Sequence, residues 1–259
     1  MQTRLSALAA VLLLLPALSC SHAAAPVPAA IPRAIPQAVP VRPDPRIGAL
    51  FLDGTDMHAC TASVLDSTGG DLLLTAAHCI AGDVRADFLP AFAGDYREAD
   101  RWQVDAVYID PRWARSTDPH ADYAIVRVHR AGSGRIEEVV GAGLRLGPAP
   151  AAGTMVTVTG YPYGVGGGPV GCQGPTADAT GAQAGFPLLS CAGLVDGTSG
   201  APWVSGSTIR GLTGGYDRGG CDDDVSFSAP FDANIERLLA RAQAGGPGDI
   251  APNTYSDTC

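Results

Sequence analysis

The chain has 259 residues, 46% of them apolar, which is enough for one large hydrophobic core or two smaller cores packed together. Its formal net charge of −9 argues against a nucleic-acid partner, because phosphate binding needs a basic surface. The 33 glycines and 21 prolines, together with few charged residues, suit many short strands joined by tight turns.

Residues 1–23 have the pattern of a signal peptide. Arg4 gives a short basic start, and the apolar stretch over residues 5–18 is too short to span a membrane comfortably. Two endings compete. Ser21-His22-Ala23 offers the small residues that a signal peptidase reads, whereas Ala17-Leu18-Ser19-Cys20 resembles a bacterial lipobox, in which Cys20 would carry a lipid anchor. Both endings predict an exported protein without a membrane span.

Residues 24–46 form a Pro/Ala-rich linker or pro-segment. A proline recurs every two to four residues over most of this stretch. Proline cannot donate to a strand ladder, so we expect polyproline II or disorder here and no ladder hydrogen bonds.

From residue 47 onward the sequence predicts an all-β domain that extends to residue 245. Clusters of Gly, Asp, Ser and Pro punctuate the apolar runs, as all-β chains require. The predicted strands cover residues 47–51, 60–65, 71–76, 102–109, 123–128, 154–160, 202–204, 208–214 and 225–230. The Gly-Ala-Pro composition of residues 142–153 predicts a crossover between two β sub-domains, about residues 47–141 and 154–230.

The end of the domain carries a helical pattern over residues 231–244. Apolar side chains recur there at Ile235, Leu238, Leu239 and Ala242, and Gly245-Gly246 closes the pattern. Residues 246–259 form a C-terminal tail.

The cysteines predict disulfides. Without Cys20 an even set remains, which is Cys60, Cys79, Cys172, Cys191, Cys221 and Cys259. An exported protein folds in an oxidising compartment, where such a set pairs. No Cys-x-x-Cys pair occurs and the five histidines are scattered, so neither a metal site nor a cofactor is predicted.

Several other conspicuous residues have ordinary structural interpretations. We expect three histidines to be polar surface residues, namely His58, His120 and His129. We expect the three tryptophans to lie in the core, namely Trp102, Trp113 and Trp203.

The residues that point to chemistry are a base, an acid and a nucleophile in that chain order. His78 lies in Thr75-Ala76-Ala77-His78-Cys79, Asp122 opens an apolar run, and Ser199 lies in Gly197-Thr198-Ser199-Gly200. A serine hydroxyl attacks well only when a base takes its proton, and a buried carboxylate holds that imidazole in the needed tautomer. The order His, Asp, Ser is one of the orders that build such a triad. Gly197 and Gly200 allow a tight turn, so the N–H groups of Gly197 and Ser199 can face one developing oxyanion.

The stretches Thr75-Ala76-Ala77-His78-Cys79 and Gly197-Thr198-Ser199-Gly200-Ala201-Pro202 resemble the two signature stretches of trypsin-like serine proteases, which have the chymotrypsin fold. The resemblance is closer to the bacterial, secreted, glutamyl-endopeptidase-like branch and covers about residues 47–243. It implies two antiparallel six-stranded β-barrels with the site in the cleft between them, and a C-terminal helix packed on the second barrel. His78 and Asp122 would come from the first barrel and Ser199 from the second.

The same resemblance suggests the disulfides and the specificity pocket. It implies a Cys60–Cys79 bridge beside the histidine. The other four cysteines allow three pairings, of which Cys172–Cys191 with Cys221–Cys259 is preferred and Cys191–Cys221 is the main rival. The pocket residues it implies are Gly193, Thr213, Gly214, Gly215 and Tyr216. Gly193 stands where trypsin carries its pocket acid, and Thr213 where glutamate-specific relatives carry a histidine, so neither preference is predicted.

The resulting hypothesis is a secreted, monomeric serine endopeptidase that acts on a protein or peptide substrate through an acyl-enzyme. A catalytically silent protein with a protease fold, which binds without cutting, is the alternative. An esterase of the α/β-hydrolase class fits poorly, because its serine precedes its histidine and Ala201 breaks the Gly-x-Ser-x-Gly motif.

Overall fold

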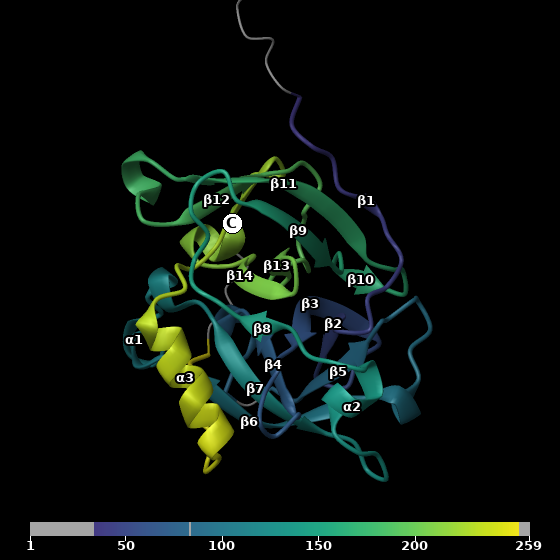
Figure 1. Ribbon diagram of the computed structural model, residues 1–259. Helices are drawn as coiled ribbons and strands as arrows, with labels where there is room; N and C mark the ends of the chain where they lie inside the picture. The colour runs from purple at the N-terminus through teal and green to yellow at the C-terminus, as the bar shows by residue number, and fades with distance from the viewer. Residues whose placement is uncertain (1–33, 83, 254–259) are drawn as a thin grey trace, which may run out of the picture. The chain divides into compact units, whose positions relative to one another are not determined.

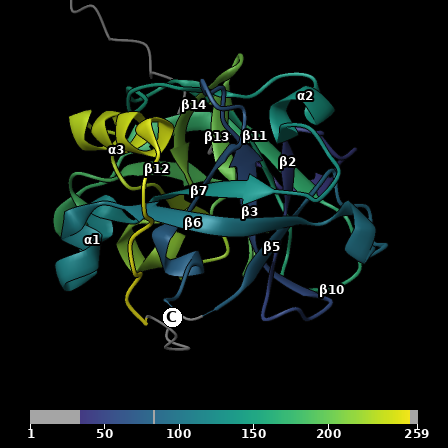
Figure 2. The same ribbon diagram turned by 90° about the horizontal axis from the view of Figure 1, so that it is seen from below.

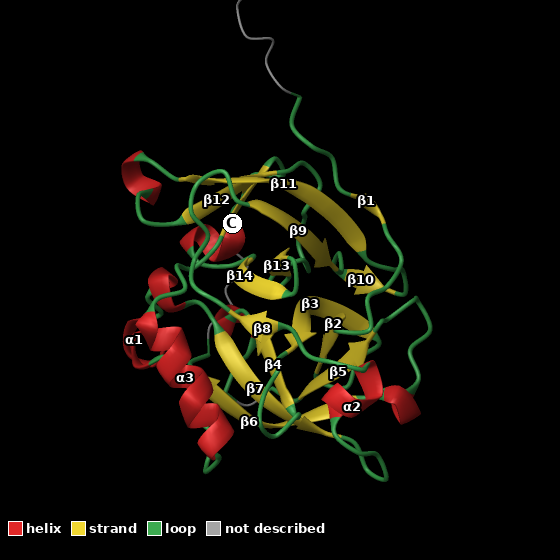
Figure 3. Ribbon diagram, in the orientation of Figure 1, coloured by secondary structure: helices red, strands yellow, loops and turns green. Residues whose placement is uncertain are grey.

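The computed structural model describes residues 34–82 and 84–253, most of which belong to one compact unit that begins at Ile35. Strands dominate this unit (Figure 3). It contains two barrel-like sheets, the first formed mainly by the N-terminal half of the chain and the second by the C-terminal half. Two short strands are exchanged: β1 (Val39–Pro40) pairs in the second sheet and β10 (Gly164–Val165) in the first. Within the described residues, no helix is both long and apolar enough to cross a membrane.

The first sheet closes on itself. Its order is β10-β3-β2-β5-β6-β7-β4, and an additional β3–β4 pairing joins the ends into a ring that leaves out only β10. All of its pairings are antiparallel. The strands are β2 (Ile47–Leu52), β3 (Met57–Val64), β4 (Leu72–Thr75), β5 (Ala86–Pro90), β6 (Trp102–Ile109), β7 (Ala124–His129) and β10. A ring with no free edge buries every residue of β2 and β4, which explains why neither strand alternates apolar and polar residues and why Thr75 is their one polar residue.

The second sheet has the order β15-β12-β11-β9-β13-β14-β8, and β1 pairs with β11 beside this path. The strands not yet given are β8 (Arg145–Leu146), β9 (Met155–Gly160), β11 (Val170–Asp178), β12 (Pro187–Ser190), β13 (Pro202–Ser205), β14 (Thr208–Leu212) and β15 (Val225–Phe227). Its core includes Trp203, Val158, Leu189 and the two cysteines Cys172 and Cys191. The prediction of an all-β fold with two barrel-like sheets is confirmed.

Helices are few and short except at the C-terminal end. They are α1 (Pro111–Ser116), α2 (Ile136–Val140) and α3 (Ala233–Ala244). The sequence predicts α3 correctly, but its expected position on the second barrel is wrong. Ile235, Leu238 and Ala242 join the core of the first sheet, and Arg127 of β7 donates to the Ala242 carbonyl at 2.6 Å. Figures 1 and 2 show α3 along β7 and β6.

Two expectations about local structure need correction, and one is confirmed. The described end of residues 24–46 does form ladder pairs, because Val39 pairs with Gly171 and Pro40 with Val170. His58 is 2% exposed rather than at the surface, because β10 and the rings of Phe51, Phe92 and Tyr161 surround it. The three tryptophans are buried as expected.

Candidate active site

His78 lies in a short helical turn directly after β4. The turn, η1, covers Ala77–Cys79, and both of its end residues are buried while the His78 side chain is 9% exposed. Cys79 forms a disulfide with Cys60 of β3. The imidazole therefore projects from a segment fixed on one side by β4 and on the other by a covalent bond to β3.

Asp122 lies between a second short turn, η3 (Pro119–Ala121), and β7, and its side chain is fully buried. Its Oδ2 accepts hydrogen bonds from His78 Nδ1 at 2.7 Å and from the Gly215 N–H at 2.7 Å, and its Oδ1 accepts from the His78 N–H at 2.9 Å. Burial alone would raise the pKa of this carboxyl, but the His78 ring and the two backbone N–H groups outweigh burial and hold the pKa below its ordinary value.

The ionised state of Asp122 determines the tautomer of His78. A carboxylate can only accept hydrogen bonds, so His78 Nδ1 carries the proton that lies between them. In the neutral ring this leaves Nε2 without a proton and able to accept one.

Ser199 lies in a turn whose two glycines admit no side chain. Gly197 has φ 87° and Gly200 has φ 80°, both in the left-handed region. A Cβ on Gly197 would be 2.1 Å from the Tyr163 nitrogen, and one on Gly200 would be 2.2 Å from the Thr61 oxygen. The glycines therefore let the turn lie directly against β3 and the segment that precedes β10.

A buried threonine that the sequence analysis did not single out links this turn to the histidine segment. The Thr61 N–H donates to the Ser199 carbonyl at 2.8 Å, and Thr61 Oγ1 donates to the Gly197 carbonyl at 3.0 Å. Thr61 follows Cys60, whose disulfide partner Cys79 follows His78. A threonine in an apolar strand carries no sequence signal for such a role.

The segment after β14 joins the turn to Asp122. The Gly200 N–H donates to the Thr213 carbonyl at 2.7 Å, and two residues later the Gly215 N–H donates to Asp122. The structure thus brings the segments of His78, Asp122 and Ser199 into one hydrogen-bonded group. Within the described residues, no hydrogen bond joins Ser199 Oγ to His78 Nε2; such bonds are often long before substrate binds.

Within the part of the chain that the structure describes, the N–H groups of the Ser199 turn alternate between bonded and unbonded. The Thr198 N–H donates to the Val195 carbonyl and the Gly200 N–H to Thr213. Neither the Gly197 N–H nor the Ser199 N–H has an acceptor among residues 34–82 and 84–253. These are the two donors that the sequence predicts for an oxyanion.

The predicted pocket residues fall into two groups. Thr213, Gly214 and Gly215 lie beside Asp122 and the turn, and Thr213 Oγ1 accepts from Trp203 Nε1 at 3.3 Å. Tyr216 begins η5 (Tyr216–Gly219) and packs on Phe227, with ring centres 5.3 Å apart. The Gly193 N–H donates to the Asp223 carbonyl at 2.9 Å.

The second disulfide is Cys172–Cys191, between β11 and the residue after β12. Cys221 is also disulfide-bonded, and Cys259, the partner predicted for it, lies outside the described residues. Cys60, His78 and Cys79 bring together three residues of metal-ligating type. Their two sulfurs are joined to each other, so this cluster supplies no thiolate.

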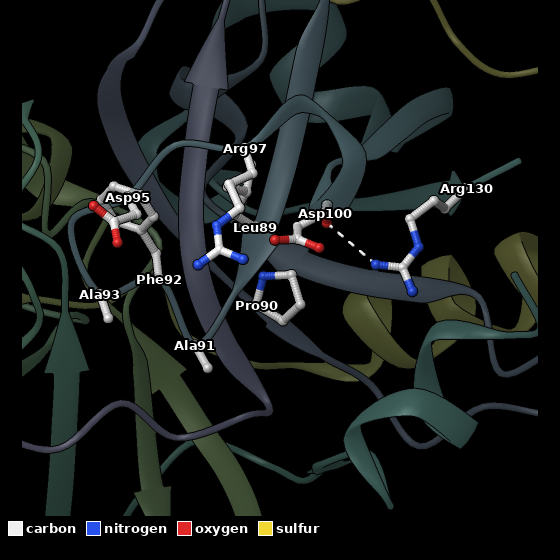
Figure 4. A pocket seen from close by; sticks show the side chains of 9 residues that line it. All are labelled: Leu89, Pro90, Ala91, Phe92, Ala93, Asp95, Arg97, Asp100 and Arg130. Carbon is white, nitrogen blue, oxygen red and sulfur yellow. Dashed lines mark hydrogen bonds between the residues drawn. The ribbon is translucent and has the colours of Figure 1, made fainter.

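A cavity of about 340 Å³ lies away from these residues (Figure 4). It is lined by residues of β5 and of the following loops, among them Leu89, Arg97, Asp100 and Arg130. Arg130 Nη1 donates to the Asp100 carbonyl across it, at 3.5 Å. None of the predicted site residues lines it.

A family model described as "Trypsin-like peptidase domain" matches residues 60–210, more than half of the chain. No curated protein sequence matches the chain.

Several solved structures are similar in fold. The protease Anisep from Arthrobacter nicotinovorans has a TM-score of 0.69 and 20% identity over 80% of this chain and 99% of its own. The thermostable serine protease AL20 from an extremophilic microorganism has a TM-score of 0.67 and 21% identity over 78% of this chain and 99% of its own. A Glu endopeptidase has a TM-score of 0.63 and 14% identity over 81% of this chain and 98% of its own.

Proposed function

Because the chain belongs to the family of trypsin-like peptidase domains, we propose that it is a serine endopeptidase that hydrolyses peptide bonds through an acyl-enzyme. The observation that carries the proposal is the environment of Asp122. A fully buried carboxylate accepts from the ring and the backbone of one histidine, and the same segments hold a serine in a glycine turn.

His78, Asp122 and Ser199 are the proposed catalytic residues. Ser199 Oγ attacks the substrate carbonyl carbon while His78 Nε2 takes its proton, and the oxyanion that develops is held by the N–H groups of Gly197 and Ser199. His78 then gives the proton to the leaving amine as the peptide C–N bond breaks. Water, activated by the same imidazole, hydrolyses the ester that remains. Asp122 fixes the Nδ1–H tautomer and stabilises the imidazolium that forms.

Gly193, Thr213, Gly214, Gly215 and Tyr216 are the proposed substrate pocket. No carboxylate or histidine is among them, so a side-chain preference of the trypsin or glutamyl-endopeptidase kind is not part of the proposal. Membership of the glutamyl-endopeptidase branch would rest on a structural likeness at 14% identity.

We further propose that the protein is exported as a monomer, with Cys20 as a candidate lipid anchor. The disulfides Cys60–Cys79 and Cys172–Cys191, both within the described residues, fit an oxidising compartment.

The test is covalent labelling with a fluorophosphonate probe together with peptide hydrolysis. The protein should be labelled at Ser199, and Ser199→Ala should lose the label and several orders of magnitude in kcat, as removal of a triad nucleophile does. Ser205→Ala, in β13, is the matched control and should keep both. If the folded protein takes no label, it is a binding protein with a protease fold.

A further inference from the structure

Residues 36–38 lie against the segment that carries Gly193. The Ala192 N–H donates to the Pro36 carbonyl at 2.8 Å, and the Ala192 carbonyl accepts from the Ala38 N–H at 2.8 Å. Gln37 Nε2 donates to the same carbonyl at 3.1 Å. Both backbone hydrogen-bonding groups of Ala192 are therefore satisfied by the N-terminal segment.

The next residues of this segment extend the contact onto β11. Val39 pairs with Gly171, Pro40 with Val170, and the Val41 N–H donates to the Pro169 carbonyl at 3.0 Å. Figure 1 shows β1 running beside β11. Residues 36–41 thus join β11 to Ala192, and the disulfide Cys172–Cys191 joins the same two parts of the chain. Ala38 packs on the core that contains both of these cysteines.

Gly193 is held between two neighbours. Its φ of 84° is one that glycine adopts freely, and a Cβ built on it would lie 2.5 Å from Gln37 Nε2. On the other side, its N–H donates to the Asp223 carbonyl, and the Cys191 N–H donates to the Asp224 carbonyl. Residues 191–193 therefore form hydrogen bonds on two sides, with residues 223–224 on one side and with the N-terminal residues 36–38 on the other.

We propose that residues 36–38 are an outer support of the substrate pocket, with Gln37 and Ala38 as positioning residues that fix Ala192 and Gly193 where the substrate side chain binds. This rests on the proposed function, because it takes Gly193 as part of the pocket. The support uses backbone groups and one amide side chain, so it needs no free N-terminal amine. It follows that processing of residues 24–46 in the active enzyme must stop before Pro36.

The experiment compares point variants of the full chain. Ala38→Pro removes the N–H that donates to Ala192, whereas Ala38→Gly keeps it and is the matched control. Gln37→Ala removes only the side-chain hydrogen bond. Each protein is assayed for kcat and KM on peptides that differ at the residue before the scissile bond, and for its rate of labelling by a small fluorophosphonate.

We expect Ala38→Pro to raise KM about tenfold and to flatten the preference among peptides, since the Ala192 carbonyl loses its backbone partner beside the pocket. Gln37→Ala should raise KM by a smaller factor, about twofold to threefold. The labelling rate should stay within about twofold in all three variants, because the small probe does not need the pocket.

Two results would overturn the inference. In the first, Gln37→Ala and folded Ala38→Pro have the same KM and the same preference among peptides as Ala38→Gly. The other is a parallel fall of labelling and hydrolysis, which would mean that the segment only stabilises the fold. If Ala38→Pro does not fold, Gln37→Ala decides alone. If the unaltered protein is not labelled, the proposed function fails instead, and this outcome is distinct from the other two.

Discussion

The two disulfides within the described residues have the same sequence separation of 19 residues but hold different parts of the candidate site. Closing loops of equal length removes equal chain entropy from the unfolded state, about 3 kcal/mol each. Their contributions to stability should therefore be alike. What differs is the neighbour of each cysteine: Cys79 follows His78, whereas Cys191 precedes Ala192 and Gly193.

This difference separates chemistry from substrate recognition. Cys60 and Cys79 lie next to Thr61 and His78, which hold the Ser199 turn and Asp122. Cys172 and Cys191 lie under the N-terminal segment and next to backbone that carries no reacting group. Damage near the first disulfide should appear in kcat, and damage near the second in KM.

The largest effect is expected for Asp122→Asn. The amide can donate to His78 Nδ1, which favours the tautomer with the proton on Nε2 and removes the base. A fall in kcat of about 10⁴-fold is expected, as for the same exchange in a serine protease triad. Steady-state kinetics of peptide hydrolysis measure this fall in kcat.

Asp118→Asn is the control for that variant. Asp118 Oδ1 also accepts from a histidine, His120 Nδ1, at 3.0 Å, but the pair is partly exposed. The kcat of Asp118→Asn should stay within about twofold of that of the unaltered protein, since exposed ion pairs contribute little. Equal losses in both variants would exclude a special role for Asp122.

The next largest effect on activity is expected when Cys60 and Cys79 are both replaced by alanine. The free energy of unfolding should fall by about 3 kcal/mol, measured by denaturant titration. The His78 segment would also lose its covalent tie to β3, and a displacement of about 1 Å at a catalytic group can lower kcat about 100-fold. An unchanged kcat in a folded variant would contradict the assignment of this disulfide to the chemistry.

The matching change at the second disulfide replaces Cys172 and Cys191 by alanine. The loss in free energy of unfolding should again be about 3 kcal/mol. KM should rise about tenfold while kcat changes less, because only the support of Gly193 is weakened. If kcat falls as far as in the Cys60/Cys79 variant, the two disulfides have the same role and the comparison fails.

The sequence predicts well those parts of the molecule whose signals are local. β4 begins with three consecutive leucines because the closed ring buries both of its faces, and α3 repeats apolar residues at helical spacing. Asp122 is recognisable from its position before β7 and from its order between His78 and Ser199.

Features that depend on distant partners could not be predicted. β11 is the longest of the described strands, yet its sequence Val-Gly-Cys-Gln-Gly-Pro-Thr-Ala-Asp has weak strand preference. Its pairing with β9 and β12 decides its conformation. Pro40 forms a ladder pair at the side of the sheet, where a missing N–H is tolerated. The role of Thr61 depends on a turn that lies 136 residues further along the chain.

The smallest effect is expected from a substitution of His58. This residue lies on β3, two residues before Cys60 of the first disulfide. Its Nε2 donates to the Gly166 carbonyl at 2.8 Å, and its buried Nδ1 has no hydrogen-bond partner within the described residues. Burial lowers the pKa of this ring, although the Gly166 carbonyl partly offsets it. The unfolded chain therefore takes up the proton first, so the stabilisation is full above about pH 6.5 and is lost as the pH falls, by at most about 1.4 kcal/mol per pH unit.

His58→Gln keeps a donor for Gly166 and removes this titration. Its free energy of unfolding, measured by urea titration from pH 8 to pH 5, should fall less steeply than that of the unaltered protein. His129→Gln, at an exposed ring on β7, is the matched control. Parallel curves for His58→Gln and the unaltered protein would mean that protonation of His58 does not contribute to the pH dependence of stability. In that case the His58–Gly166 hydrogen bond, the pairing of β3 with β10 and the packing of the His58 ring would hold this end of β3 without a contribution from the charge of His58.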